Sequence, residues 1–202
     1  MLSKIKEALE HGLFLHMLET KLKRFGIRLT IFYLVTEGDF ASPPEWPDQY
    51  ADYEPFILSR EDMETIAPDH PWDDLAGLRS RHDRGHICVG LRHGDQIAAC
   101  TWVDLEQCNH APLPFKMSDN EAYLYDAFTL PSFRGKGLAP YMREQCYEQL
   151  RAMSRDKFYS VSSYLNKPSV RFKQKLNARF EELFVSVATK TGKLHTVKLK
   201  SY

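Results

Sequence analysis

The sequence predicts one compact α/β (α+β) domain in which helices and strands alternate without internal repeats. Three observations carry this prediction. Apolar residues recur with the helical period over residues 2–25. Two strand-like runs are joined by a hairpin turn at residues 93–95. A strand-like run at 122–130 meets a helix-like run at 141–153 through a glycine-rich turn. Hydrophobic residues make up 43% of the chain and charged residues 27%, as in ordinary globular domains.

The elements follow in order along the chain. Gly26 ends the first helix, and the β-branched and aromatic run 27–36 predicts a strand. Ser59 and Asp62 form a capping box at the start of the helix expected over 60–67. The other expected elements are a proline-rich loop at 38–55, a short strand at 55–58, a helix or loop at 72–84, strands at 86–92 and 96–105, a loop at 107–120, a strand at 158–165, a helix at 168–178 and a hairpin of 182–189 with 194–199.

The glycine-rich turn reads Arg134-Gly135-Lys136-Gly137-Leu138-Ala139 and opens a helix. Such a turn points several backbone N–H groups at one spot, and the helix N-terminus adds about half a unit of positive charge. The pattern therefore predicts a phosphate or pyrophosphate site. Leu138 and Ala139 stand where a Walker loop needs Lys and Ser or Thr, and Pro140 replaces the third glycine of the dinucleotide pattern. An ordinary helix-capping turn is the alternative.

The spacing Arg-x-x-Gly-x-Ala resembles the pyrophosphate loop of the Gcn5-related N-acetyltransferases (GNAT), which bind acetyl-coenzyme A (acetyl-CoA). The run 129–133 resembles the strand end and turn that precede this loop in the family. A second match follows, because the run 166–180 resembles the next strand–helix unit. Asn177 replaces the usual glycine near the end of that unit, and Asn is the next-best residue for a left-handed C-cap.

The resemblance covers about residues 55–200. It implies a mixed, mostly antiparallel central sheet that is flanked by helices and splayed between the strands at 122–130 and 158–165. It also divides the chain into an extension at 1–54 and a GNAT-like domain at 55–202. The helix and strand of the extension could pack on the sheet edge, cover the acceptor site or form a homodimer contact. A helix lying on a membrane surface is a less favoured alternative.

The resemblance implies acetyl-CoA as the co-substrate, with no metal. Residues 127–129 would contact the pantetheine arm, and residues 135–140 would surround the pyrophosphate. A backbone N–H near Phe128 or Thr129 would stabilise the oxyanion. The full set of expected cofactor-binding residues is Ala127, Phe128, Thr129, Arg134, Gly135, Lys136, Gly137, Leu138, Ala139, Pro140, Asn166, Ser169 and Lys173.

The proton-transfer groups are expected at other positions. Many family members place a tyrosine, as the general acid, seven residues after the asparagine, where this chain has Lys173. A lysine could serve only if burial lowered its pKa strongly, so a structural role or a contact with the phosphoadenosine is favoured. Tyr164 is the expected acid, with Tyr125 as a weaker candidate, although either could simply pack. Asp126 is the expected base and could instead be a solvated or helix-capping carboxylate. The other candidate bases are Glu121, Asp104 and Glu106, and His110 is expected on the surface.

The implied function is N-acetyltransfer from acetyl-CoA to an amine by direct attack. The acceptor would be a small amine, an amino sugar, an amino acid or a peptide amine. Transfer of a longer acyl chain and a non-catalytic coenzyme A-binding domain are the alternatives. Residues 131–202 carry 15 Lys/Arg and 5 Asp/Glu, a balance of +10, so residues 1–130 carry −10. A basic half suits the anionic coenzyme and an acidic half suits a cationic acceptor, unless both are merely solvated faces.

Several other classes are disfavoured. No aromatic-interleaved basic stripe indicates nucleic-acid binding. No apolar run is long enough to cross a bilayer, and the first residues lack the order of a signal peptide. The four cysteines lack CxxC spacing, so a structural zinc is not expected. Buried free thiols in a cytoplasmic protein are the expectation.

Overall fold

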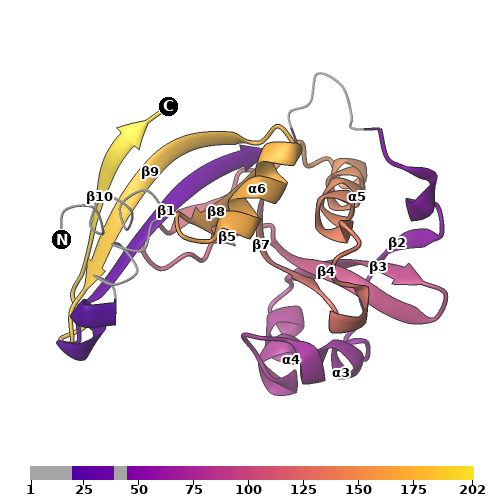
Figure 1. Ribbon diagram of the computed structural model, residues 1–202, viewed down its shortest axis with the longest axis horizontal. Helices are drawn as coiled ribbons and strands as arrows, with labels where there is room; N and C mark the ends of the chain where they lie inside the picture. The colour runs from indigo at the N-terminus through magenta and orange to yellow at the C-terminus, as the bar shows by residue number, and fades with distance from the viewer. Residues whose placement is uncertain (1–19, 39–44) are drawn as a thin grey trace, which may run out of the picture.

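The computed structural model describes residues 20–38 and 45–202. Its strands are β1 (Arg28–Glu37), β2 (Tyr53–Ile57), β3 (Ile87–His93), β4 (Gln96–Asp104), β5 (Gln107–Cys108), β6 (Phe115–Lys116), β7 (Glu121–Thr129), β8 (Lys157–Ser163), β9 (Arg179–Ala188) and β10 (Leu194–Ser201). Eight of them form one sheet in the order β10-β9-β1-β8-β7-β4-β3-β2, and β5 pairs with β6 (Figure 1).

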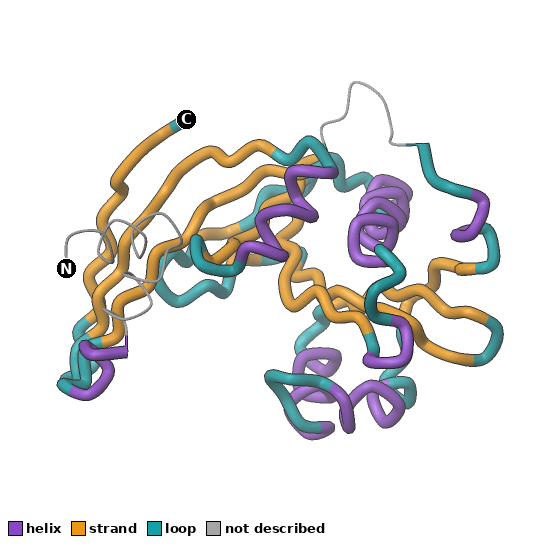
Figure 2. The backbone as a smooth tube through the Cα atoms, viewed as in Figure 1, coloured by secondary structure: helices purple, strands orange, loops and turns teal. Residues whose placement is uncertain are grey.

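The α-helices of the labelled elements are α3 (Met63–Ile66), α4 (Leu75–Asp83), α5 (Leu138–Ala152) and α6 (Lys167–Lys175), and the 3-10 turns are η1 (Asp48–Tyr50), η2 (Ala67–Asp69) and η3 (Pro131–Phe133). Helices α5 and α6 lie on one face of the sheet, and α3 and α4 lie on the other (Figures 1 and 2). Within the described ranges, no helix is both long and apolar enough to span a membrane.

The sheet is mixed and mostly antiparallel, as expected. Among the described strands, only β7 and β8 pair in parallel, through Glu121–Tyr123 and Lys157–Tyr159. The other adjacent strand pairs of the sheet are antiparallel. Buried side chains fill both faces, among them Trp102, Tyr147 and Phe158, each with 0% exposure. Full burial of one such large apolar side chain contributes about 1.5–3 kcal/mol.

Strand β1 lies inside the sheet, which corrects the expectation that it could pack on the edge. It pairs with β8 on one side and with β9 on the other. Phe32 and Val35 are fully buried, so this aromatic and β-branched strand is covered as an internal strand must be. The two edge strands of the sheet are β10 and β2. The division of the chain at residue 54 stays a prediction, and residues 2–19 of the expected first helix lie outside the described ranges.

Local sequence signals are largely confirmed. Ser59 and Asp62 make the two reciprocal bonds of a capping box, from Ser59 N to Asp62 Oδ2 (2.7 Å) and from Asp62 N to Ser59 Oγ (3.3 Å). The helix that follows is shorter than expected, because α3 begins at Met63 and gives way to η2 at Ala67. Asn177 adopts the left-handed conformation, with φ of 50°, after α6. The expected loop at 107–120 contains the short β5–β6 ladder.

Candidate active site

The sheet opens between β7 and β8, as the family resemblance implies. Their parallel pairing stops at Tyr123 and Tyr159, so no described strand pairs with the second half of β7 on that side. On the other side, the β4–β7 register shifts between Cys100 and Trp102. The extra residue on β7 is accommodated by Asp126, whose φ of 46° is rare outside glycine. The bulge turns the chain at the point where the two strands diverge.

The strand after the bulge presents backbone groups to the open side. Leu130 N donates to Ala98 O (3.0 Å), so Leu130 points its backbone toward β4. Because successive residues of a strand point their N–H and C=O groups to opposite sides, those of Thr129 face away from β4. The N–H of Thr129 is therefore available on the open side of β7.

The glycine-rich loop carries exposed amides at the start of α5. Gly135 and Gly137 have φ of 79° and 73°, which only glycine adopts readily. Gly137 is the N-cap of α5, and no side chain caps that end. Tyr50 Oη donates to Lys136 O (3.0 Å), and Arg134 Nε donates to Thr129 O (3.1 Å), so the loop is held from outside. A helix N-terminus of this kind attracts an anion.

A cavity of about 360 Å³ lies in the opening between β7 and β8. We call it the splay cavity. It is lined by Trp72, Leu124, Tyr125, Asp126, Ala127, Ala139, Arg143, Val161, Asn166, Pro168, Ser169, Phe172 and Lys173. Five of the expected cofactor residues are brought together here: Ala127, Ala139, Asn166, Ser169 and Lys173. Gly135 and Lys136 line a separate hollow of about 320 Å³ with Tyr50 and Tyr53.

The other expected cofactor residues contribute little side-chain surface to the splay cavity. Phe128, Leu138 and Pro140 are buried in the structure, so only their backbones could meet a ligand. Asn166 caps α6, because its Oδ1 accepts from Ser169 N (3.2 Å). Ser169 Oγ also lies 3.1 Å from Ser162 Oγ. The capping asparagine and its partner thus fix the wall of the cavity as well as lining it.

Lys173 belongs to a buried cluster of Glu37, Arg143, Tyr147, Ser160 and Lys173. The side chain of Glu37 is 0% exposed and lies 3.5 Å from Arg143 Nε and 3.4 Å from Lys173 Nζ. Tyr147 and Ser160 donate to its two oxygens, and Lys173 Nζ donates to Ser160 Oγ (2.5 Å). Burial alone would raise the pKa of Glu37, but the two cations outweigh it and lower the pKa to about 2. Burial lowers the pKa of Lys173 to about 8.

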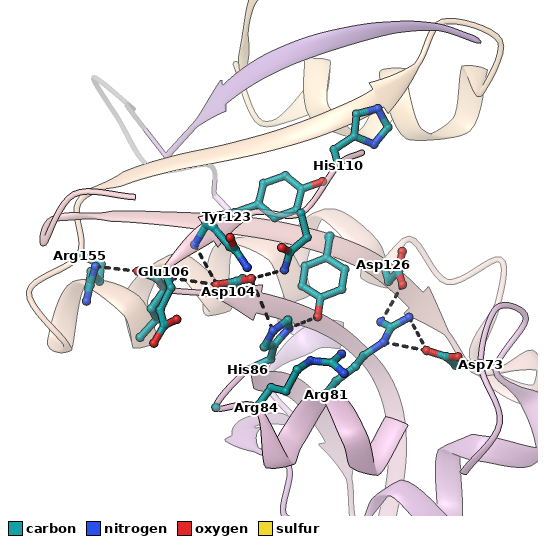
Figure 3. Close-up of a pocket in the computed structure, with 15 residues that line it drawn as sticks. Asp73, Arg81, Arg84, His86, Asp104, Glu106, His110, Tyr123, Asp126 and Arg155 are labelled. Atoms are coloured by element: carbon teal, nitrogen blue, oxygen red, sulfur yellow. Dashed lines mark hydrogen bonds and ion pairs between the residues drawn. The ribbon is translucent and has the colours of Figure 1, made fainter. Parts of the chain in front are cut away.

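A second and larger cavity, of about 1030 Å³, opens on the face of α4 (Figure 3). We call it the polar cavity. Its walls are Asp73, Arg81, Arg84, Gly85, His86, Asp104, Leu105, Glu106, Gln107, Asn109, His110, Tyr123, Tyr125, Asp126 and Arg155. Tyr125 and Asp126 line this cavity and the splay cavity alike. The bulge on β7 is thus the wall between the two.

Arg81 of α4 holds Asp126 in place. Its Nη1 lies 2.7 Å from Asp126 Oδ2, and its Nη2 lies 2.8 Å from Asp73 Oδ2. The guanidinium also stacks over the rings of Trp102 (5.4 Å) and Tyr125 (5.2 Å). The left-handed backbone at Asp126 is therefore supported by an ion pair from another element.

Asp104, His86 and Tyr125 form a continuous polar chain in the polar cavity. His86 Nδ1 is hydrogen-bonded to the hydroxyl of Tyr125, and His86 Nε2 lies 3.5 Å from Asp104 Oδ2. Asp104 accepts from the backbone of Glu106 (2.9 Å) and Gln107 (3.0 Å) and from the side chain of Asn109. Burial lowers the pKa of His86 and raises that of Tyr125.

The sheet register explains why these residues meet. Ile87 pairs with Val103, so His86 lies opposite Asp104 at the start of β3. Asp104 in turn pairs with Tyr123, and Trp102 pairs with Tyr125. His86 is not among the site residues expected from the sequence. It is the first residue of the strand expected at 86–92, but its partners depend on two antiparallel registers.

The expected catalytic residues are separated in the structure. Asp126 lies in the wall between the cavities, whereas Tyr164 lines neither of them. Tyr164 packs against Tyr33 (5.7 Å between ring centroids) and under the ammonium of Lys167 (4.6 Å). Among the other candidates, Asp104, Glu106, His110 and Tyr125 line the polar cavity. Glu121 is paired with Lys157 (2.9 Å) outside both cavities.

Solved structures share this fold. A Drosophila protein is 13% identical, with a TM-score of 0.58 over 90% of this chain and 59% of its own. A GNAT-family protein from Novosphingobium aromaticivorans is 18% identical, with a TM-score of 0.56 over 87% of this chain and 69% of its own. A tandem GNAT protein from the clavulanic acid biosynthesis pathway is 12% identical, with a TM-score of 0.56 over 86% and 55%. This chain thus spans 55–69% of the length of these three proteins.

No curated protein matches the chain in sequence. The sequence model of the Acetyltransferase (GNAT) family matches residues 44–178, which is more than half of the chain. The matched range contains both cavities and the glycine-rich loop. The chain belongs to the GNAT acetyltransferase family.

Proposed function

We propose that the protein transfers the acetyl group of acetyl-CoA to an amine. The observation that carries the proposal is that Tyr125 and Asp126 line two cavities on opposite sides of the same bulge. A thioester in the splay cavity and an amine in the polar cavity would meet at this wall. Holding two reactants in contact in this way is itself a large part of catalysis for a bimolecular transfer.

The cofactor end of the proposal rests on backbone groups. The uncapped amides at the start of α5 would bind the diphosphate, and the unpaired half of β7 would bond with the pantetheine amides. The N–H of Thr129, which faces away from β4, is the proposed oxyanion donor. The basic balance of residues 131–202 favours the polyanionic coenzyme.

The acceptor end rests on the charges of the polar cavity. Asp73, Asp104, Glu106 and Asp126 supply four carboxylates, which suit an amine that arrives as a cation. The same cavity also contains positive charge, from Arg81, Arg84 and Arg155. A small polar amine, an amino sugar, an amino acid or a peptide N-terminus would suit it. The proposed role of Asp126 is to hold the amine beside the thioester.

Two alternatives to acetyl transfer predict different binding and activity. Phe128 and Trp102 are almost fully buried in the core beside the bulge, which favours a short acyl group such as acetyl. A longer-chain acyltransferase would instead be indicated by tighter binding of palmitoyl-CoA. A binding domain without activity would take up acetyl-CoA and release no thiol with any amine.

A matched pair of glycine variants tests the cofactor end. Gly135 and Gly192 share φ of 79°, and a Cβ at either would meet nothing within 4 Å. Both Gly→Glu substitutions therefore carry similar backbone strain, but only Gly135→Glu puts a negative charge at the proposed diphosphate. Gly137 is a poorer choice, because a Cβ there would lie 2.8 Å from Tyr50 Oη.

Isothermal titration with acetyl-CoA is the measurement. We expect Gly135→Glu to weaken binding by at least ~100-fold, which corresponds to about 2.7 kcal/mol. Gly192→Glu should bind as the unaltered chain does. Equal binding by both variants would mean that the glycine-rich loop does not hold the coenzyme. Thiol release from acetyl-CoA with spermidine, glucosamine or glycine then tests the transfer itself.

A further inference from the structure

We propose that His86, oriented by Asp104, is the general base for the acceptor amine and exchanges the proton through Tyr125. The inference rests on the proposed function, because it assigns the proton path of that reaction. It is carried by one geometric fact. Tyr125 lines both cavities, and its hydroxyl is hydrogen-bonded to His86 on the side of the polar cavity.

The hydrogen bonds determine which ring nitrogen of His86 carries the proton. The Asp104 carboxylate already accepts three hydrogen bonds, and a carboxylate offers His86 Nε2 only an acceptor. Nε2 therefore carries the proton in the neutral ring, and Nδ1 presents its lone pair to the Tyr125 hydroxyl. In this tautomer His86 can take a proton from Tyr125 at the moment when Tyr125 takes one from the amine.

The surroundings of His86 favour its neutral form, which has a free lone pair on one ring nitrogen. Burial lowers its pKa, and the nearby cations Arg84 and Arg81 act in the same direction, whereas Asp104 and Glu106 raise it. The net effect is a neutral imidazole at neutral pH. Once protonated, the ring would be stabilised by Asp104, which is 3% exposed.

The proton balance closes over one reaction. An acceptor that arrives as an ammonium first releases one proton to water, and the neutral amine nitrogen then attacks the thioester carbonyl and forms the C–N bond. Its surplus proton passes to the Tyr125 oxygen as the Tyr125 hydroxyl proton passes to His86 Nδ1. The C–S bond then breaks, and the thiolate receives a proton from Tyr125, which takes one back from His86. An amide and a thiol leave, and His86 is neutral again.

Other groups near the wall are less suited to this role. Asp126 already has one oxygen in an ion pair with Arg81 at 2.7 Å. Lys173 lines only the splay cavity, and Glu37 and Ser160 hold its ammonium. Tyr125 and His86 are the pair that joins the amine side to the thiol side.

Steady-state kinetics with acetyl-CoA and the best of spermidine, glucosamine and glycine test the relay. We expect His86→Gln and Tyr125→Phe each to lower kcat by ~10²–10⁴-fold, as for loss of general base catalysis. Acetyl-CoA affinity should change less than about twofold on titration, because neither hydroxyl nor imidazole holds the diphosphate. The acidic limb of the kcat/KM profile, which reports His86, should disappear in His86→Gln.

His82→Gln is the control, because His82 lies on α4 four residues from His86 and lines neither cavity. It should keep full activity and the acidic limb. If His86→Gln retains turnover and the acidic limb while the unaltered chain is active, the relay is wrong and the proposed function stands. If the unaltered chain binds acetyl-CoA but releases no thiol with any of the three amines, both the proposed function and the relay are wrong.

Discussion

Two groups of charged side chains lie on either side of β7, and they differ in what surrounds them. The buried cluster of Glu37, Arg143, Tyr147, Ser160 and Lys173 has side chains of 0–2% exposure at its three charges. The chain of Asp104, His86 and Tyr125, with Arg81 and Asp126 beside it, lines an open cavity. Both groups contain a carboxylate, a cation and a tyrosine hydroxyl.

We propose that the buried cluster stabilises the fold, whereas the groups in the polar cavity act on a substrate. In the buried cluster each charge lies within 3.5 Å of an opposite charge of the protein, across β1, α5 and α6, and Arg143 and Lys173 also line the splay cavity. Its only anion, Glu37, lies outside residues 44–178, whereas both cations lie inside that range. The N-terminal strand therefore supplies the counter-charge for two cations in the wall of the splay cavity. In the polar cavity the same types of group face space that a substrate can enter.

The largest expected effect on stability comes from Glu37→Gln. This change keeps the shape but leaves Arg143 and Lys173 as buried cations without a counter-ion. We expect the free energy of unfolding to fall by about 3–5 kcal/mol, as when one partner of a buried pair is removed. Urea unfolding followed by circular dichroism measures it.

Glu54→Gln is the matched control on the surface. Glu54 pairs with Arg92 at 3.0 Å, with side chains that are 67% and 50% exposed. We expect a loss of no more than about 1 kcal/mol there. Similar losses for Glu37→Gln and Glu54→Gln would contradict the structural role of the buried cluster.

Acid should remove the difference between the unaltered chain and Glu37→Gln. The pKa of Glu37 is lowered from 4.5 to about 2 in the folded chain, so the unfolded chain binds the proton more tightly. The stabilisation is complete above pH 4.5 and is lost as the pH falls toward 2. Unfolding free energies of both proteins at pH 6, 4 and 3 should converge on acidification. A constant gap would show that Glu37 does not act through its charge.

Tyr147→Phe should have an intermediate effect. The variant loses the hydroxyl that donates to Glu37 but leaves both cations in place. A hydrogen bond to a charged group contributes about 1.5–3 kcal/mol, so the loss should lie below that of Glu37→Gln. Tyr159→Phe is the control, because Tyr159 donates to Glu121 (3.2 Å) outside the cluster. Equal effects of the two variants on urea unfolding would argue against a special role for the buried hydroxyl.

Asp126→Asn should affect stability least. Its ion pair with Arg81 is partly exposed, so we expect about 0–1 kcal/mol, and Asn tolerates the left-handed backbone at this position. Turnover should nevertheless fall more than acetyl-CoA affinity, because Asp126 faces both cavities. Normal turnover in steady-state assays would remove Asp126 from the proposed site.

Local signals in the sequence predicted the local parts of this site. The glycine-rich loop, the capping box at Ser59 and the left-handed Asn177 each depend on residues within one turn. The loop and the strand–helix unit after it were enough to indicate the family. These features form where the sequence places them because their hydrogen bonds join near neighbours.

Contacts between distant segments were not predictable in the same way. Glu37 meets Lys173 only because β1 enters the sheet between β8 and β9, and no local signal specifies that position. His86 meets Tyr125 through the registers of β3, β4 and β7. Tyr164 follows its strand as expected but turns toward Tyr33 instead of the cavities. Where side chains meet through the registers of distant strands, their partners can be identified only from the structure.

A crystal structure with bound acetyl-CoA would show whether the coenzyme lies where we propose. We expect the diphosphate on the amides of residues 135–139 and the thioester at the wall formed by Tyr125 and Asp126, with its carbonyl oxygen near the N–H of Thr129. A coenzyme whose thioester lies away from that wall, or whose diphosphate avoids the start of α5, would contradict it.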